Sequence, residues 1–168
     1  MSLFKDYLAL TKPRITWLIL MSTAIGFYFG LPQLNPQKTQ WVLFHLIFGT
    51  ALIASGTAAL NQWWERESDR FMSRTASRPL PSGKISPRNA LVFGIILATL
   101  GFVELWLGCN LLTACLGLFT LASYLFCYTP MKRMSPHSTT VGAIPGAMPP
   151  LIGFAAAAGI LTWEAWAL

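Results

Sequence analysis

The sequence predicts an all-α fold, a bundle of transmembrane helices in a polytopic membrane protein. Hydrophobic residues make up 54% of the 168 residues and charged residues 11%, and the mean hydropathy is +0.53. These values lie outside the range of an ordinary soluble domain. The apolar residues also fall in uncharged runs close to the ~20 residues that a helix needs to span a bilayer. We therefore expect the lipid bilayer to be the main partner of the surface.

Five apolar stretches along the chain define the expected spans. They cover approximately residues 15–34, 41–64, 89–108, 111–128 and 138–161. The first stretch is longer than the apolar core of a secretory signal and no A-x-A cleavage pattern follows it, so we expect it to remain as a span. Residues 1–168 are predicted to form a single integral membrane domain, with short connectors and one longer polar segment, 65–88.

The positions of the basic residues predict the orientation. When the connectors are assigned alternately to the two sides, eleven of the 12 Lys and Arg residues fall on one side and only Lys38 on the other. By the positive-inside rule, the N-terminus and the segment 65–88 face the cytoplasm, at the inner membrane of a bacterial cell. Topology thus accounts for the net charge of +6, and nucleic acid is not expected as a partner.

Three oxygen-bearing side chains recur every four residues around the start of the polar segment: Asn61, Glu65 and Asp69. Each step of four advances only ~40° around a helix, so the three share one face over ~12 Å. Mg²⁺ prefers oxygen ligands and is often held by one or two carboxylates together with substrate phosphates. We predict that these three residues are metal ligands and catalytic residues. The alternative is a helix end that becomes polar where it meets water.

Basic side chains near these residues predict a diphosphate site, because guanidinium and ammonium groups bind phosphate. The candidates, all on the predicted cytoplasmic side, are Arg74, Arg78, Lys84, Tyr128, Lys132 and Arg133. Metal and cations would stabilise the negative charge that develops as an allylic diphosphate leaves, while the apolar bundle would protect the carbocation from water. Topogenic charge, surface salt bridges and contacts with anionic lipid are the alternatives for the basic residues.

Three stretches resemble the UbiA superfamily of intramembrane prenyltransferases, and within it the branch that farnesylates protohaem. They are LTKPRI (10–15), NQWWERESDRFMSRTASRPLPSGKIS (61–86) and YTPMKRMSPHSTTVGAIPGAMPPLIGF (128–154). The resemblance implies a helical bundle, Mg²⁺ as cofactor, farnesyl diphosphate and haem B as substrates, and haem O and diphosphate as products. By position, Asn61, Glu65 and Asp69 correspond to the first aspartate-rich motif of the family, with Glu65 where Asp is common. His137 stands where many relatives have Asn.

The resemblance also implies about nine spans, of which these residues contain five. The second aspartate-rich motif of the family belongs to the latter half, which is not among these residues. We therefore expect residues 1–168 alone to be inactive or nearly so. The missing C-terminal half, or a downstream haem-modifying enzyme, is the expected protein partner.

Three other functions remain open. The acidic motif is shared across the superfamily, so a prenyltransferase of a quinone or chlorophyll pathway is the nearest alternative. A haem-carrying electron-transfer subunit is disfavoured, since His45 and His137 fall near opposite membrane faces and cannot ligate one haem within a single chain. A transporter or assembly module would account for the prolines and the GxxxG motif of the fifth span, 138–161.

Overall fold

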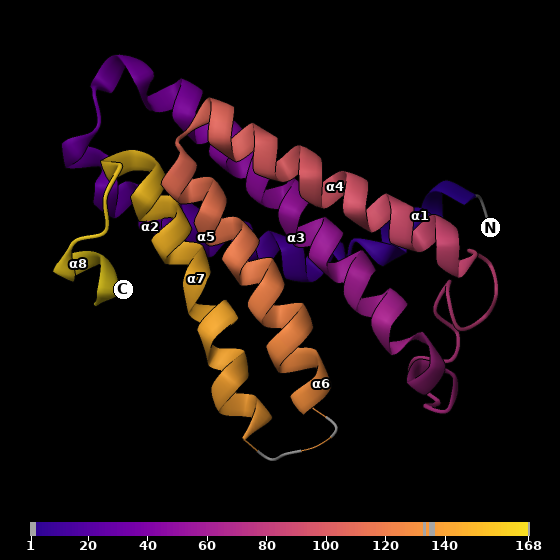
Figure 1. Cartoon of the computed structure of the whole chain (residues 1–168). Coiled ribbons are helices and arrows are strands. Elements are labelled where there is room, and N and C mark those ends of the chain that lie inside the picture. The colour runs from indigo at the N-terminus through magenta and orange to yellow at the C-terminus, as the bar shows by residue number, and fades with distance from the viewer. Residues whose placement is uncertain (1–2, 133, 135–136, 168) are drawn as a thin grey trace.

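The structure, a computed structural model, describes residues 3–132, 134 and 137–167, and every regular element in these ranges is a helix (Figure 1). Five helical segments are long and apolar enough to cross a membrane: Pro13–Gln33, Pro36–Arg70, Pro87–Gly108, Leu111–Met131 and Ser138–Ala158. The prediction of an all-α fold with five spans is confirmed. The largest boundary differences are at the second span, which extends several residues further at both ends.

Short elements extend or interrupt several of these spans. The helices in chain order are α1 (Leu3–Leu10), α2 (Pro13–Gly30), α3 (Thr39–Arg70), α4 (Pro87–Gly108), α5 (Leu111–Ala122), α6 (Thr129–Met131), α7 (Ser138–Ala158) and α8 (Trp163–Trp166). Two 3-10 turns, η1 (Leu31–Gln33) and η2 (Pro36–Lys38), connect α2 to α3, and a π-helical segment, η3 (Ser123–Tyr128), joins α5 to α6.

The helices pack as two close pairs, α3 with α4 and α2 with α7. Glycines make the close approach possible. A Cβ atom on Gly56 of α3 would lie 2.8 Å from the carbonyl oxygen of Gly94 on α4. A Cβ atom on Gly26 of α2 or Gly153 of α7 would overlap the backbone of the partner helix. Small residues at these positions are typical of membrane helices, which associate by close packing.

The two sides of the bundle diverge toward one end. Figure 1 shows α5 and α7 separating from α3 and α4 toward the end where α3 stops and α6 lies. We call this end the open end. Residues 71–86, which connect α3 to α4, form turns there. The open end therefore combines the polar C-terminal part of α3 with the segment that follows the fourth span.

Helix α7 is continuous through its three prolines. Its GxxxG motif does not act as a helix-packing face over its whole length. Gly142 faces the ring of Tyr128, whereas a Cβ atom on Gly146 would meet no other atom within 4 Å. The broken helix that a transporter would use is therefore not present in this segment.

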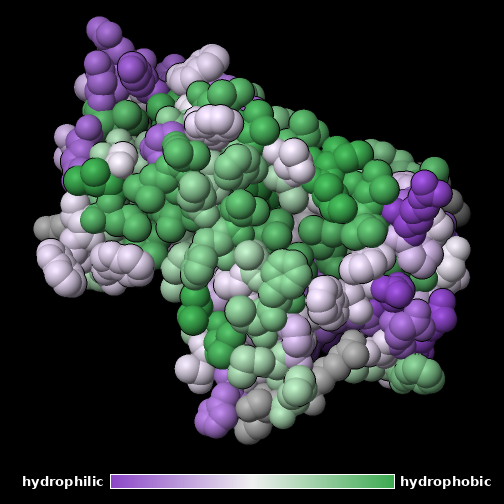
Figure 2. Space-filling model, viewed as in Figure 1, coloured by the Kyte–Doolittle hydropathy of each residue, from purple (hydrophilic) through white to green (hydrophobic). Residues whose placement is uncertain are grey.

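Large apolar side chains cover the outside of the spans. Trp17, Leu18 and Leu107 are each at least 60% exposed, and Figure 2 shows a broad hydrophobic band between more polar ends. An apolar surface of this extent requires a partner that is itself apolar. Together with the five long apolar helices, it identifies an integral, multi-pass membrane protein.

Candidate functional site

A cavity of about 460 Å³ lies at the open end, and most of its lining residues are charged or polar, so we call it the polar cavity. Asn61, Glu65 and Asp69 of α3 all line it. Its basic lining residues are Lys12 between α1 and α2, Arg74 and Arg78 after α3, and Lys132 after α6. The structure therefore gathers residues from four parts of the chain around the side chains that the sequence spaced at intervals of four.

Asn61 and Glu65 are connected to each other and to the fourth span. The Asn61 Nδ2 group donates to Glu65 Oε2 at 2.9 Å, and the Thr129 hydroxyl lies 2.9 Å from Asn61 Oδ1. The second oxygen of Glu65 lies 3.3 Å from Lys132 Nζ. Both α3 side chains are buried, so these partners are needed to offset the loss of water. They fix the amide and carboxylate orientations in the cavity.

The π-helical segment η3 positions Thr129 for this contact. The Thr129 hydroxyl also lies 2.9 Å from the backbone oxygen of Tyr124, five residues earlier. Segments with π geometry occur as short interruptions in α-helices and are frequent at functional sites. Here the segment places Thr129 against Asn61, and Tyr124 becomes part of the cavity lining.

Asp69 is held by the segment that follows α3. Its Oδ2 atom lies 2.6 Å from Arg78 Nη1, and its backbone oxygen accepts a hydrogen bond of 2.9 Å from the Thr75 hydroxyl. The latter satisfies one of the carbonyl groups that a helix leaves free at its C-terminal end. The Asp69 side chain is only 6% exposed and that of Arg78 is 26% exposed. Residues 71–78 thus fold back over the helix end and bring a guanidinium group to the carboxylate.

Lys12 enters the polar cavity from a strained turn. It precedes α2 with a φ of 48°, in the left-handed region that non-glycine residues rarely adopt. The Gln62 side chain holds this turn, because its Nε2 donates to the backbone oxygen of Leu10 at 2.9 Å. Burial lowers the pKa of Lys12, and the nearby Arg78 lowers it further. An anion bound in the cavity would raise the pKa of Lys12 again, because its negative charge would stabilise the ammonium group.

The charges of the lining favour an anion. Four cationic side chains and two carboxylates line the polar cavity, a difference of two positive charges. The cations are Lys12, Arg74, Arg78 and Lys132. Two of them are paired with the carboxylates, while Arg74 and Lys12 form no ion pair within 4.0 Å with a carboxylate of the described residues. A polyanionic group is therefore the ligand that the cavity suits best.

Three predicted site residues are not among the described lining of the polar cavity. Lys84 is exposed and does not line the cavity. Tyr128 also lies outside it, with its ring 5.1 Å from that of Tyr124 and against Gly142. Arg133 lies outside the described residues.

Sequence reasoning missed four residues that build the polar cavity. Lys12 was interpreted only as a topogenic charge, although a lysine directly before the proline that starts a span was a usable signal. Gln62 and Tyr124 carried no signal of their own, and Thr129 was marked only as part of the polar stretch 128–133 that follows the fourth span. Their roles depend on contacts with distant parts of the chain and, for the last two, on the π-helical geometry.

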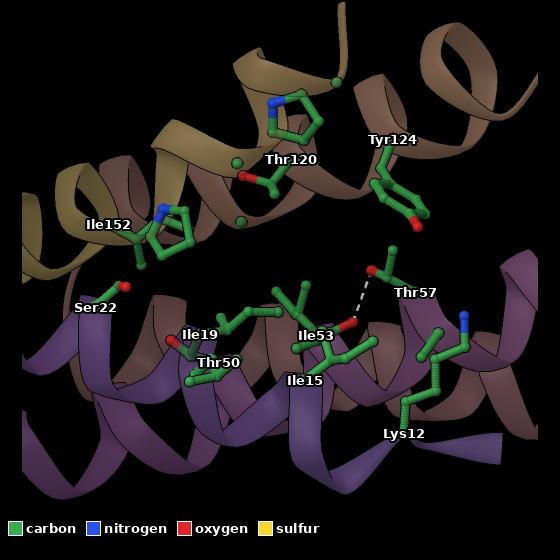
Figure 3. Close-up of a pocket in the computed structure, with 18 of the residues that line it drawn as sticks. Lys12, Ile15, Ile19, Ser22, Thr50, Ile53, Thr57, Thr120, Tyr124 and Ile152 are labelled. Carbon is green, nitrogen blue, oxygen red and sulfur yellow. Dashed lines mark hydrogen bonds between the residues drawn. The ribbon is translucent and has the colours of Figure 1, made fainter. Parts of the chain in front are cut away.

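A second cavity, of about 380 Å³, lies beside the polar one within the bundle, and Figure 3 shows its lining. We call it the apolar cavity, since most of its lining is aliphatic side chains, glycines and prolines of α2, α3, α5 and α7. Lys12, Ile15 and Tyr124 line both cavities. In Figure 3, Lys12 and Tyr124 lie at one end of the apolar cavity, and Ser22 and Ile152 lie at the other. The pair of cavities therefore fits an amphiphile with an anionic head and a long apolar tail.

The polar cavity also fits a hard divalent cation. Glu65, Asp69 and Asn61 supply two carboxylates and one amide oxygen, which suits Mg²⁺ together with substrate phosphates. In the described ranges no group of three or more His, Cys, Asp and Glu side chains comes together. The nitrogen and sulfur ligands preferred by zinc are thus not gathered there. This donor set therefore suits Mg²⁺ better than zinc.

The fold and the two cavities define a class of protein, an integral membrane protein with an apolar cavity beside a cationic, oxygen-rich one. The model of the UbiA prenyltransferase family matches residues 18–168, and the chain belongs to this family.

Several relatives are similar over nearly the whole chain. A protein of Solibacter usitatus is 65% identical over 98% of this chain and 58% of its own length, and one of Koribacter versatilis is 46% identical over 99% and 54%. A protein of Opitutus terrae is 42% identical over 98% and 55%. All three are named protoheme IX farnesyltransferase. The chain spans about half the length of these relatives. No solved structure gives a significant match.

Proposed function

We propose that the chain is the catalytic front part of a protohaem IX farnesyltransferase, which joins the farnesyl group of farnesyl diphosphate to a vinyl group of haem B and produces haem O and diphosphate. One observation carries the proposal: a cavity with two carboxylates and four cations lies next to an apolar cavity, and the two share the lining residues Lys12, Ile15 and Tyr124. This arrangement fits an isoprenoid diphosphate. The choice of haem as acceptor is supported by the names of the relatives, one of them 65% identical.

The residues of the polar cavity divide into two groups by charge. Asn61, Glu65 and Asp69 would hold Mg²⁺, which when bound supplies positive charge to the leaving diphosphate. Arg78 and Lys132 already lie beside these carboxylates, so they are within reach of phosphate groups bound with the metal. Lys12 and Arg74 complete the cationic lining, and Arg133 belongs to the same proposed set. Lys84 and Tyr128 also belong to the proposed diphosphate-binding set, although they do not line the cavity.

The reaction needs charge stabilisation first and water exclusion next. The allylic carbon–oxygen bond of farnesyl diphosphate breaks, and its electron pair leaves with the diphosphate, where the cations stabilise it. The farnesyl carbocation is then attacked by the π electrons of the haem vinyl group, which forms the new carbon–carbon bond. Water adds to the resulting cation on the haem side chain and loses a proton, which gives the hydroxyl of haem O. The apolar cavity keeps water from the farnesyl carbocation before this attack.

The junction between the cavities is where the reacting carbon would lie. Lys12 and Tyr124 line both cavities, so a diphosphate in one and an isoprenoid chain in the other place the bond to be broken between them. We propose that this mouth faces the cytoplasm, where the positive-inside rule puts the basic residues of the open end. The remaining half of a full-length relative would add further ligands for the diphosphate.

The test uses the complete gene product in membranes, supplied with haem B, farnesyl diphosphate and Mg²⁺. Haem O, detected by chromatography and mass, is the expected product, and chelation of Mg²⁺ should abolish its formation until the metal is restored. A parallel reaction offers an aromatic quinone precursor in place of haem B. Transfer to the quinone precursor but not to haem B would support the prenyltransferase activity but show that haem B is not the acceptor. Absence of transfer to either would overturn the proposal.

A further inference from the structure

Leu105 lines the apolar cavity at the level of Gly49 on α3 and Gly117 on α5, at the end of the α3 and α5 lining that is farther from Tyr124. This residue comes from α4, and it is the one α4 residue among the described lining. Its side chain is completely buried. It fits between α3 and α5 because both helices have glycine opposite it: a Cβ atom would lie 2.8 Å from Leu105 Cδ2 if placed on Gly49, and 3.2 Å from Leu105 Cδ1 if placed on Gly117. Leu105 therefore fills a space that two glycines leave open.

The depth of the cavity follows from helix geometry. The lining runs from Lys12, directly before α2, to Ser22 on α2, and on α3 it runs from Ala58 to Thr50. At ~1.5 Å per residue these separations correspond to about 15 Å and about 12 Å. Figure 3 shows the same direction, from Lys12 and Tyr124 at one end to Ser22 and Ile152 at the other. The chamber is thus about 12–15 Å deep from the end beside the polar cavity to the opposite end.

This depth matches one isoprenoid length. An extended chain advances about 1.1–1.2 Å per backbone bond, since three bonds of a polypeptide span at most ~3.3–3.6 Å. The main chain of a farnesyl group, with twelve carbons, is then about 13 Å long, and that of a geranylgeranyl group, with sixteen, about 17 Å. The first is close to the depth of the chamber, and the second exceeds that depth by about 2–5 Å, at most one isoprene unit.

Building on the proposed function, we propose that Leu105 determines the length of the isoprenoid chain that the site accepts. Its side chain stands where a fourth isoprene unit would enter. Truncation would open the space between Gly49 and Gly117, which have no side chains to refill it. Gly117 acts in the opposite sense, because a methyl group there would press on Ile53 Cδ1, 2.8 Å away, and on Leu105. Leu105 thus acts on chain length, without touching the reacting carbon.

The experiment measures kcat/KM of the complete gene product with geranyl, farnesyl and geranylgeranyl diphosphates, with haem B as acceptor. Leu105→Ala should raise the geranylgeranyl-to-farnesyl ratio by roughly 10- to 200-fold, the range by which apolar pockets discriminate chain size. Gly117→Ala should raise the geranyl-to-farnesyl ratio instead. Leu46→Ala is the matched control, because Leu46 is equally buried in the core but does not line the cavity. Its ratios should equal those of the wild type.

The outcomes separate this inference from the proposed function. A wild-type protein that transfers no farnesyl group overturns the proposed function. A wild-type protein that transfers farnesyl, combined with unchanged ratios in Leu105→Ala and Gly117→Ala, overturns the role of Leu105. If Leu105→Ala does not accumulate, Leu105→Val removes less volume and carries the same test, with Gly117→Ala as the independent variant. Ratios that shift equally in Leu46→Ala would also contradict the inference, since they would indicate general loosening of the core.

Discussion

The carboxylate of Asp69 offers the sharpest test of the site, through the substitution Asp69→Asn. The side chain is 6% exposed and lies 2.6 Å from Arg78. Asparagine keeps the shape and one oxygen acceptor for Arg78, so the lost stability should be only about 1 kcal/mol, the difference between a charge-assisted and a neutral hydrogen bond. The loss in catalysis should be larger. Removing one group that stabilises transition-state charge typically costs about 10²–10³ in kcat, or ~3–4 kcal/mol.

The assay is haem O formation by membranes that contain the complete gene product, normalised to the amount of protein. Thermal unfolding in detergent checks that Asp69→Asn remains folded. Glu67→Gln is the matched control: its carboxylate is 62% exposed and pairs with Arg66 and Arg70, and such surface pairs contribute about 0–1 kcal/mol. The control should keep wild-type turnover. Turnover of Asp69→Asn within a few fold of the wild type would remove this carboxylate from the proposed chemistry.

Three further predictions address the surroundings of the site. Lys12→Met should raise KM for farnesyl diphosphate roughly tenfold or more, since a hydrogen bond to a charged group is worth about 1.5–3 kcal/mol. Burial lowers the pKa of Lys12, so the folded state binds this proton less tightly than the unfolded chain. The variant should therefore melt higher than wild type at pH 7, by an amount that shrinks as the pH rises toward the ordinary lysine range; a melting temperature that falls would contradict this. Glu104→Leu removes the partner of His45, which lies 2.6 Å away at the opposite end of the bundle from the polar cavity. The variant should lose about 1–3 kcal/mol of stability and keep the KM of the wild type. A changed KM would connect this pair to the site. Gly153→Ala places a methyl group against the backbone of α2 and should reduce the yield of folded protein on size exclusion. Gly146→Ala is the control, because a Cβ atom there meets no other atom within 4 Å, and its yield should equal that of the wild type. Equal yields of the two variants would refute the close packing of α2 on α7.

The fold was predictable because hydropathy and charge report directly on the bilayer. The five spans follow from apolar runs, and the glycines and prolines within them do not disturb that signal. The interval of four between Asn61, Glu65 and Asp69 was equally informative, since α3 continues through all three without a break. These features depend on local sequence and helix geometry alone.

The remainder of the site depends on contacts between distant residues. Arg78 reaches Asp69 only because α3 ends at Arg70, well before Pro79, so that the following segment turns back. Thr129 meets Asn61 across 68 positions of the sequence. Lys84 and Tyr128 were selected by their nearness in sequence to the same motifs, and the folded chain directs them elsewhere. Periodicity places residues on a face, but it does not determine which distant side chains meet that face.

The pairing of each carboxylate with a cation affects how a metal ion and a diphosphate would bind together. With the lining at two net positive charges, a divalent cation that entered alone would raise the charge to four. A diphosphate ester, with about three negative charges near neutral pH, would lower the charge to about minus one if it entered alone. Together they leave about plus one. In the proposed complex, Glu65 and Asp69 would hold the metal, and Lys132 and Arg78, which now pair with these carboxylates, would be available to the diphosphate. Metal and diphosphate should consequently bind as linked ligands, each increasing the affinity for the other. Until both ligands are bound, the ion pairs Asp69–Arg78 and Glu65–Lys132 would keep the buried charges compensated.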